Sequence, residues 1–289
     1  MDTKSEMPPE QSLVIGGTGV VGGYIVEHLL RRGERPMVLS RSPGGTPDVE
    51  WIIGDMREPS KFKLPAFKTL YCTANAVLFA DVLPQILNPS LQRVVVFSST
   101  SVLTKMDTEI VAEREGLRKL ADAEQRIAAL CEQNDVGWTI LRPTLIYKEG
   151  RDGNITPLSR LIRRFGFMVL VGGANGLRQP VHAEDLAIGA IAAAASAAAV
   201  DRFYSLPGAE TISYREMIGR IFDALQLPRR TISVPPALWR MAFIAAKPLF
   251  PGANVAMGIR MMKDMTFDAT PAVRDFGWNP RGFHPTFNE

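Results

Sequence analysis

The feature that most constrains the fold is the stretch SLVIGGTGVVGGYIVEHLLRRG, Ser12 to Gly33, in which an apolar run meets a cluster of glycines and continues into a helical pattern. Glycine permits a tight strand-to-helix turn and, because it lacks a Cβ, lets backbone N–H groups approach a phosphate. The stretch therefore predicts a strand, a glycine-rich turn and a helix whose N-terminus could hold an anion.

Two registers of the glycine pattern overlap in this turn. Gly17 to Gly22 fits G-x-G-x-x-G, and Gly16, Gly19 and Gly22 fit G-x-x-G-x-x-G. The pattern alone is weak evidence, because a plain glycine-rich turn has the same composition. Between an apolar strand and an amphipathic helix it predicts a dinucleotide site, with the pyrophosphate at the helix N-terminus and with Gly22 allowing close packing of the helix on the strand.

The N-terminal half of the chain alternates strand-like and helix-like segments. Such alternation is typical of a parallel sheet with helices on both faces, and right-handed crossovers make it a doubly wound, Rossmann-like α/β sheet. After Tyr147 the pattern loosens, with an Ala-rich helix from Ala183, a strand RFYSL and a helix capped by Ser213. We expect a flexible leader, a dinucleotide-binding domain and a smaller, interleaved substrate lobe with segments that return to the sheet, over residues 1–11, 12–150 and 151–289.

The ends of the predicted strands bear on the cofactor. An acidic residue at the end of the second strand would bind the ribose hydroxyls of NAD, but the chain has Ser40 and Arg41 there. Arg41 could pair with a 2′-phosphate, which favours NADP(H) over NAD as the cofactor, although NAD stays possible. An exposed loop arginine without a ligand would give the same sequence pattern. Asp55, just past the third strand, could accept a hydrogen bond from the adenine amino group.

Composition narrows the other classes of function. The net charge is only +3 and no Lys/Arg block exists, so nucleic-acid binding has little support. Two cysteines and three widely spaced histidines predict neither a disulfide scaffold nor a metal site, and they suit a reducing cytoplasm. The polar, acid-containing N-terminus is unlike a signal or transit peptide.

One apolar segment, ALWRMAFIAAKPLF at residues 237–250, stands out in the C-terminal half. It is interrupted by Arg240, Lys247 and Pro248, so it is too short to span a bilayer. Its Trp and cations fit a helix that lies at a membrane surface. They fit equally well a helix that covers a substrate pocket, which is the interpretation we prefer.

Taken together, the motifs GGTGVVG, GDM, FSSTSV, LRPTLIY, RQPVHAEDLA and FGWNP resemble those of the extended short-chain dehydrogenase/reductase superfamily, the NAD-dependent epimerases and dehydratases. The resemblance covers nearly the whole chain in the expected order. It implies pyrophosphate contacts from the glycine loop, further cofactor contacts from the strand ends, a catalytic hydroxyl at Ser99, and substrate phosphates on Arg178. The implied cofactor residues are Gly16, Thr18, Gly19, Val20, Val21, Gly22, Met56, Thr73, Ala74, Ser98 and Pro143.

The chain departs from this superfamily at the Tyr-x-x-x-Lys pair, in which a tyrosine acts as general acid/base. An ungapped count back from Pro143 puts Gly116 and Leu120 at the two positions, and a shift by one gives Glu115 and Lys119. Neither frame supplies a tyrosine. Lys119 could remain as a ribose-binding or proton-donating group, or be a solvated surface residue. Tyr147 could reach the substrate from the end of the sixth strand, although a packed tyrosine is the simpler interpretation.

Two functions therefore compete. One is an atypical oxidoreductase or epimerase-type enzyme that acts on a small molecule such as a nucleotide sugar. The other is a catalytically silent NADP(H)-binding sensor or accessory subunit, because fold alone does not settle function. Whether the chain forms a homodimer stays open at this point.

Overall fold

The protein is described by a computed structural model that covers residues 11–105, 108, 110–246 and 255–287. The expected leader, apart from residue 11, lies outside the described residues. The chain divides into two compact units that interleave along the sequence. Unit 1 consists of residues 1–143, 183–206 and 269–279, and unit 2 consists of residues 144–182, 207–268 and 280–289.

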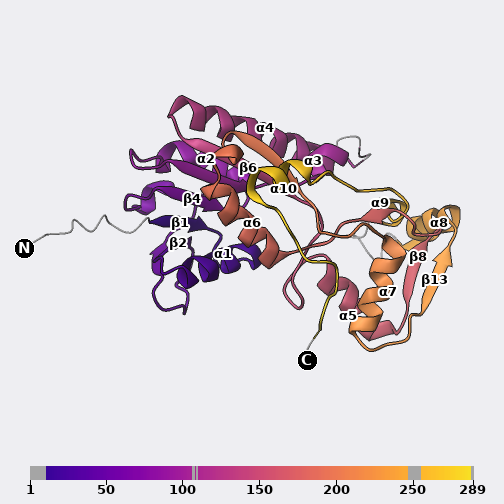
Figure 1. The fold of residues 1–289 in the computed structure, drawn as a ribbon. Coiled ribbons are helices and arrows are strands. Elements are labelled where there is room, and N and C mark those ends of the chain that lie inside the picture. The colour runs from indigo at the N-terminus through magenta and orange to yellow at the C-terminus, as the bar shows by residue number, and fades with distance from the viewer. Residues whose placement is uncertain (1–10, 106–107, 109, 247–254, 288–289) are drawn as a thin grey trace, which may run out of the picture. The chain divides into compact units, whose positions relative to one another are not determined.

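Unit 1 contains a seven-stranded sheet in the order β11-β6-β5-β4-β1-β2-β3, and every neighbouring pair is parallel (Figure 1). This confirms the doubly wound, Rossmann-like α/β class. Every residue of β1 and β5 is buried, as a sheet covered on both faces requires. The strands are β1 (Ser12–Ile15), β2 (Met37–Ser40), β3 (Glu50–Ile53), β4 (Thr69–Cys72), β5 (Arg93–Phe97), β6 (Gly137–Pro143) and β11 (Arg202–Leu206).

The helices of unit 1 pack in two layers on the sheet. α1 packs against α6 on one face and α2 against α4 on the other (Figure 1). Short 3₁₀ turns lie at Pro59–Lys61 and Ala197–Ala199. The helices are α1 (Val20–Arg31), α2 (Ala76–Ile86), α3 (Ser101–Thr104), α4 (Val111–Gln133), α6 (Ala183–Ala195) and α10 (Thr270–Phe276).

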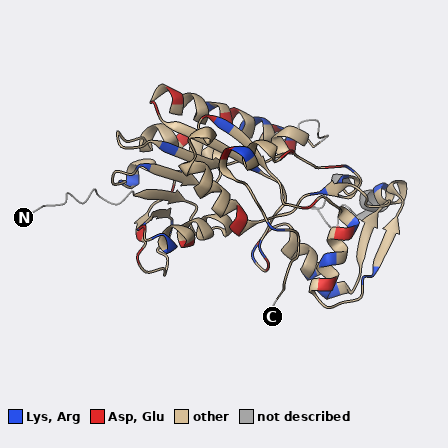
Figure 2. Ribbon diagram, in the orientation of Figure 1, with Lys and Arg blue, Asp and Glu red and all other residues tan. Residues whose placement is uncertain are grey.

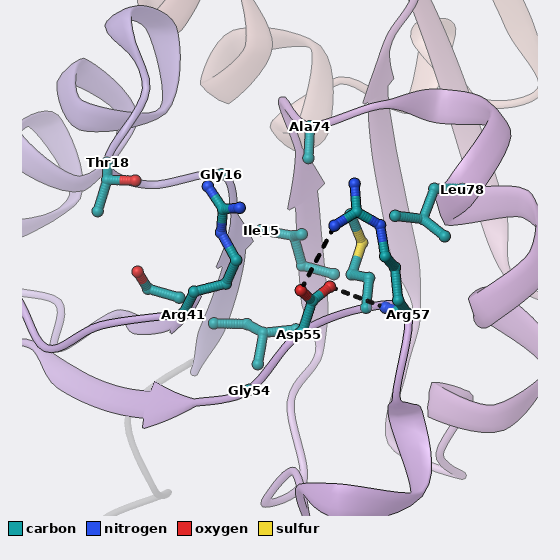
Figure 3. A pocket seen from close by; sticks show the side chains of 12 residues that line it. Ile15, Gly16, Thr18, Arg41, Gly54, Asp55, Arg57, Ala74 and Leu78 are labelled. Atoms are coloured by element: carbon teal, nitrogen blue, oxygen red, sulfur yellow. Dashed lines mark hydrogen bonds and ion pairs between the residues drawn. The ribbon is translucent and has the colours of Figure 1, made fainter.

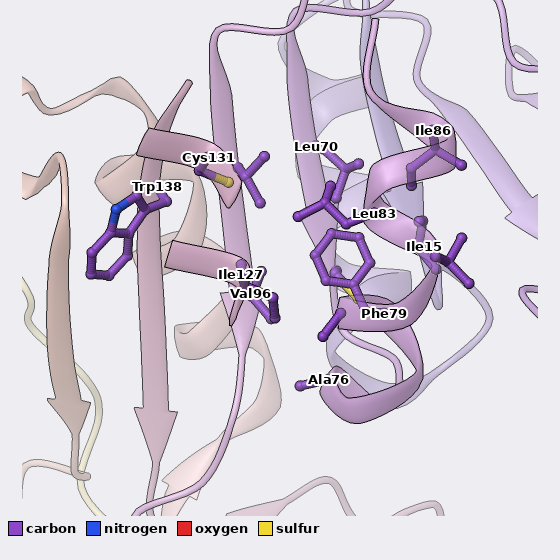
Figure 4. Packing of buried hydrophobic residues seen from close by; sticks show 14 of the residues in the cluster. Ile15, Leu70, Ala76, Phe79, Leu83, Ile86, Val96, Ile127, Cys131 and Trp138 are labelled. Atoms are coloured by element: carbon purple, nitrogen blue, oxygen red, sulfur yellow. The ribbon is translucent and has the colours of Figure 1, made fainter. Parts of the chain in front are cut away.

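The core beneath α2 and α4 fixes the strand ends from which the candidate site is built. Phe79 and Leu83 of α2 and Ile127 of α4 are buried against strand residues such as Leu70 and Val96 (Figure 4). Burial of an aliphatic or aromatic side chain of this size stabilises a fold by about 1.5–3 kcal/mol. The carboxyl ends of β1, β2, β4 and β5 are thereby held on a rigid scaffold.

A buried ion pair ties α4 to β6. Arg142 donates from Nε to Glu124 Oε1 at 2.9 Å and from Nη2 to Oε2 at 2.5 Å, and the Glu124 side chain is only 2% exposed. The guanidinium also lies 4.4 Å from the centroid of the Phe203 ring on β11. Three elements that sequence spacing cannot connect are therefore joined at one guanidinium.

We expect Glu124→Gln to lower the free energy of unfolding by about 3 kcal/mol, because it leaves the Arg142 charge half-buried without its counter-charge. Asp122→Asn is the matched control on the same helix, since Asp122 is exposed and its pair with Arg126 is a surface pair worth less than about 1 kcal/mol. Urea denaturation of both variants measures the difference. Equal effects of the two substitutions would contradict a role for the buried pair.

Unit 2 is built from three two-stranded sheets and four helices in its described part. Ser213 caps α7, as expected, because its Oγ accepts the N–H of Glu216 at 3.0 Å. α5 packs against α7 around a core that includes Ile162 and Phe222. The paired strands are β7 (Ile146–Tyr147) with β10 (Val181–His182), β9 (Leu177–Arg178) with β12 (Ile212–Ser213), and β8 (Met168–Val171) with β13 (Thr231–Val234); the helices are α5 (Ile155–Phe165), α7 (Tyr214–Ala224), α8 (Pro236–Ala246) and α9 (Val255–Arg260).

Prolines lie at two element boundaries. β6 ends at Pro143, which has no N–H to continue the ladder, and β7 belongs to unit 2. β13 ends at Val234, and Pro236 opens α8, where its missing N–H costs nothing.

The segment 237–250 is described only in part. Residues 247–250 lie outside the described residues, and Leu238 and Met241 of α8 are 54% and 66% exposed. In the part of the chain that the structure describes, none of the helices combines the length and apolarity that a bilayer crossing demands.

Candidate functional site

The glycine-rich turn between β1 and α1 depends on two close approaches. Gly16 has φ +89°, a backbone conformation that favours glycine. A Cβ on Gly22 would lie 2.2 Å from the Gly16 carbonyl oxygen and 2.7 Å from Thr73 Oγ1. The Thr73 hydroxyl donates to the Gly16 carbonyl at 3.1 Å. The expected role of Gly22 in close helix–strand packing is therefore visible as a steric requirement.

The N-terminus of α1 is open to a ligand. Gly19 is its N-cap residue, is exposed and provides no side-chain cap, and its own N–H donates to the Gly16 carbonyl at 2.9 Å. The helix starts at Val20, while the Val21 side chain is 5% exposed and faces the core. The first-turn N–H groups of a helix lack intrahelical partners and carry a partial positive charge. This turn therefore has the geometry of an anion cradle.

Beside the turn lies a cavity of about 280 Å³ (Figure 3). It brings together seven residues that the sequence predicted as cofactor contacts, drawn from the ends of β1, β2, β3 and β4. They are Gly16, Thr18, Ser40, Arg41, Asp55, Met56 and Ala74. Apolar side chains of Ile15, Leu39 and Leu78 also line it. A polar rim and apolar walls are what a nucleoside would need.

Charge in this cavity is dominated by two arginines. Arg41 and Arg57 lie on opposite sides of Asp55 (Figure 3). The Arg57 N–H donates to Asp55 Oδ1 at 2.9 Å, and its Nη1 lies 3.8 Å from Asp55 Oδ2. Sequence reasoning missed Arg57, although its place two residues after Asp55, just past the end of β3, was the available signal. The single carboxylate leaves a net positive charge in the cavity.

The carboxyl end of β5 holds the two adjacent serines. Ser98 Oγ is buried and, among the described residues, has no hydrogen-bond partner. Ser99 Oγ accepts the Ser101 N–H at 3.1 Å, so its own proton is available to a ligand. Pro143 ends β6, the strand next to β5, and its carbonyl accepts hydrogen bonds from both the N–H and the hydroxyl of Thr100. The structure thus brings Ser98, Ser99 and Pro143 to neighbouring strand ends.

Lys119 lies elsewhere on unit 1. It is an exposed residue of α4 and lines a hollow of about 440 Å³ together with Asn75, Leu78, Asp81 and Arg57. Ser99 is not among the residues that line this hollow. Arg57 and Leu78 line both this hollow and the cavity of Figure 3.

In unit 2, the Arg178 guanidinium is hydrogen-bonded to the protein itself. Its side chain is buried, and its guanidinium donates to the carbonyls of Leu177 and Lys263 at 2.7 Å and of Arg260 at 2.5 Å. It also lies 5.4 Å from the centroid of the Tyr214 ring, and burial lowers its pKa. The expected contact with substrate phosphates is replaced by a structural role that anchors the 260–263 segment.

Tyr147 is likewise a packed residue. It is 1% exposed, its hydroxyl donates to the Gly282 carbonyl at 3.5 Å, and its ring packs edge-on against His182 and Phe283. His182 Nε2 lies 3.7 Å from the Glu149 carboxylate. The simpler interpretation of Tyr147 therefore holds, and burial leaves it no surface for a substrate.

The described residues hold no metal-binding cluster of three or more His, Cys, Asp or Glu.

No protein-family model matches the chain. It is 26% identical over 252 residues to the mitochondrial NADH dehydrogenase (ubiquinone) 1 alpha subcomplex subunit 9 of Arabidopsis thaliana, covering 77% of this chain and 60% of that subunit. It is 21% identical to UDP-glucose 4-epimerase of Vibrio cholerae over 97% of this chain and 94% of that enzyme.

A structure of UDP-glucose 4-epimerase from Thermus thermophilus in complex with NAD superposes with a TM-score of 0.67 at 17% identity, covering 95% of each chain. The resemblance to extended short-chain dehydrogenases/reductases is confirmed. The chain has the fold of that superfamily, with its parallel sheet in unit 1 and the smaller sheets in unit 2. Within a short-chain dehydrogenase/reductase fold, the cavity of Figure 3 lies at the carboxyl ends of the strands, where open α/β sheets bind ligands.

We expect Gly22→Ala to destabilise the protein by about 1–3 kcal/mol, because the added Cβ would overlap the Gly16 carbonyl oxygen. Gly23→Ala is the matched control in the same helix turn. The nearest atom to a Cβ there is 3.6 Å away, so the higher helix propensity of alanine should leave stability unchanged or raise it. Thermal denaturation of the two variants measures the contrast, and a tolerated Gly22→Ala would contradict the close approach.

Proposed function

We propose that the chain binds a nicotinamide dinucleotide, with NADP(H) preferred over NAD(H), and acts as an atypical oxidoreductase or epimerase-type enzyme. The observation that carries the proposal is the convergence of the glycine turn, two strand-end arginines and Asp55 on one cavity. The pyrophosphate would lie at the N-terminus of α1, where Gly19 has no side chain to obstruct it. Ile15 and Leu78 offer the adenine an apolar contact.

The cofactor preference rests on charge. A ribose 2′-phosphate carries up to two negative charges, which a cavity with two guanidiniums and one carboxylate favours. Asp55 keeps Arg57 at the cavity through a backbone hydrogen bond and a long ion pair. Arg41 has no hydrogen bond or ion pair among the described residues, so its guanidinium is available to a phosphate.

The serines at the end of β5 support a catalytic function. A bound nicotinamide would supply hydride transfer, and the Ser99 hydroxyl could donate to a substrate oxygen. The buried Ser98 Oγ without a partner is a group that a ligand could satisfy, since such groups in native proteins are normally hydrogen-bonded. The substrate would be a small molecule, and the names of the relatives favour a nucleotide sugar.

A catalytically silent NADP(H)-binding sensor or accessory subunit is the second candidate. Its support is that α4 supplies no tyrosine at the position of the superfamily's acid/base pair, which falls on Gly116 and Leu120 in one frame and on Glu115 and Lys119 in the other. A relative named as a subunit of a larger complex is consistent with it. A screen of nucleotide sugars and small carbonyl compounds separates the candidates, because only the enzyme converts a substrate. NADPH oxidation reports a reductase, and chromatography of the product reports an epimerase, which regenerates its cofactor in each turnover.

Calorimetric titration with NADPH, NADP, NADH and NAD tests the proposal directly. Gly19→Val should lose measurable binding of every dinucleotide, because the side chain would occupy the phosphate cradle. The fold should survive, since Gly19 has φ −76° and a Cβ there meets only the Gly16 carbonyl oxygen, at 3.1 Å. Gly23→Ala should bind as the wild type does. Wild-type protein that binds none of the four nucleotides would sink the proposal.

Arg41→Ala and Arg57→Ala should each weaken NADPH about tenfold while leaving NADH nearly unchanged, because each removes a charge-assisted hydrogen bond to the 2′-phosphate alone. Arg35→Ala is the control, since Arg35 is exposed and does not line the cavity. Equal losses of affinity for NADPH and NADH would contradict the proposed preference for NADP(H). They would leave the proposal of dinucleotide binding unaffected.

A further inference from the structure

Unit 2 contains a basic cavity that the dinucleotide site does not use. Its volume is about 430 Å³, and it lies between one face of α5, the 148–150 segment and residues 286 and 287. We propose that this cavity binds the phosphate or diphosphate group of a small molecule. The inference is independent of the proposed cofactor site, because every residue that lines this cavity belongs to unit 2 and the cavity of Figure 3 belongs to unit 1.

The cavity wall is a single stripe of α5. Thr156, Ser159, Arg160 and Arg163 recur at the three- and four-residue spacing that puts side chains on one helix face. Thr156 and Ser159 are buried, at 3% and 4% exposed, whereas the two arginines are exposed. Hydroxyl groups therefore lie on the inner side of the stripe and guanidiniums lie on its solvent side.

Neither arginine of the stripe is neutralised by the protein. Among the described residues, Arg160 and Arg163 make no hydrogen bond or ion pair, and α5 carries three arginines without any acidic residue (Figure 2). Arginines with structural roles in this chain look different. Arg142 donates to the Glu124 carboxylate through Nε and Nη2, and Arg178 donates to three backbone carbonyls through Nη1 and Nη2. Two unpaired guanidiniums one helical turn apart repel each other unless an anion joins them.

The acidic residue at the cavity is already engaged. Glu149 accepts the Thr286 N–H at 3.1 Å and lies 3.7 Å from His182 Nε2. Burial would raise the pKa of Glu149, but the hydrogen bonds from His182 and from backbone N–H groups outweigh it and hold that pKa below its ordinary value. Glu149 therefore pairs away from the arginines, and the ammonium of Lys148 adds a third positive charge to the lining.

The chemistry of these groups selects the ligand. Guanidiniums match phosphate oxygens in pairs, and an ammonium adds a point charge. The two guanidiniums favour a ligand with at least two negative charges. The volume is of the size that small-molecule pockets have, and it is larger than a single phosphate needs. A phosphorylated small molecule or a diphosphate fits both the charge and the space.

Calorimetric titration of the full-length protein with inorganic pyrophosphate at constant ionic strength tests the site. The titration uses the Gly19→Val background, so that the glycine turn of unit 1 cannot account for the binding. Arg160→Ala and Arg163→Ala should each weaken pyrophosphate at least about tenfold, the loss of one charge-assisted hydrogen bond. Arg164→Ala is the matched control, because it removes the same charge from the same helix but does not line the cavity.

The outcomes distinguish binding in the cavity from non-specific attraction of the anion to the positive charge of α5. Loss of affinity in the two cavity variants with an unchanged Arg164→Ala supports the proposal. Equal weakening in all three variants, or no binding of millimolar pyrophosphate by the parent protein, overturns it. Thermal denaturation of each variant verifies the fold, and exposed arginines at these positions should leave the melting temperature unchanged. NADPH binding by the wild type is measured separately, so failure here leaves the cofactor proposal standing.

Discussion

The contact on which the candidate site depends is the close approach of α1 to the turn that follows β1. There is no room for a Cβ at Gly22, because the Gly16 carbonyl oxygen and the Thr73 hydroxyl already lie against it. That contact holds the N-terminus of α1 over the end of β1 and ties the β4 end to it through the Thr73 hydrogen bond. Every other residue of the cavity takes its position relative to this fixed turn.

The parallel sheet converts this local geometry into a site. Strands that all run in one direction bring their carboxyl ends to one edge, so short segments from β1 to β4 meet although about sixty residues separate the first from the last. The same edge carries Ser98 and Ser99 after β5. On α4, Lys119 lines a neighbouring hollow that shares Arg57 and Leu78 with the cavity.

Unit 2 illustrates how burial separates structural from ligand-binding arginines. Arg178 belongs to a motif that resembles a phosphate contact, yet its Nη1 and Nη2 groups donate to three backbone carbonyls inside the unit. Arg160 and Arg163 belong to no motif, yet their guanidiniums lie beside a cavity and have no partner among the described residues. A polar group is available to a ligand only where the fold has not already satisfied it.

The sequence by itself determined the Rossmann-like sheet, the glycine turn and most residues of the cavity, because hydrophobic periodicity and glycine placement are local properties. It also predicted the Ser213 cap. The tertiary structure alone decided which side chains meet: it added Arg57 to the cavity, placed Lys119 in a neighbouring hollow, and buried Tyr147 and Arg178. In the tertiary structure β6 also ends at Pro143, and the segment that follows, which contains β7, belongs to unit 2. These outcomes depend on contacts between residues distant in sequence, which no local pattern encodes.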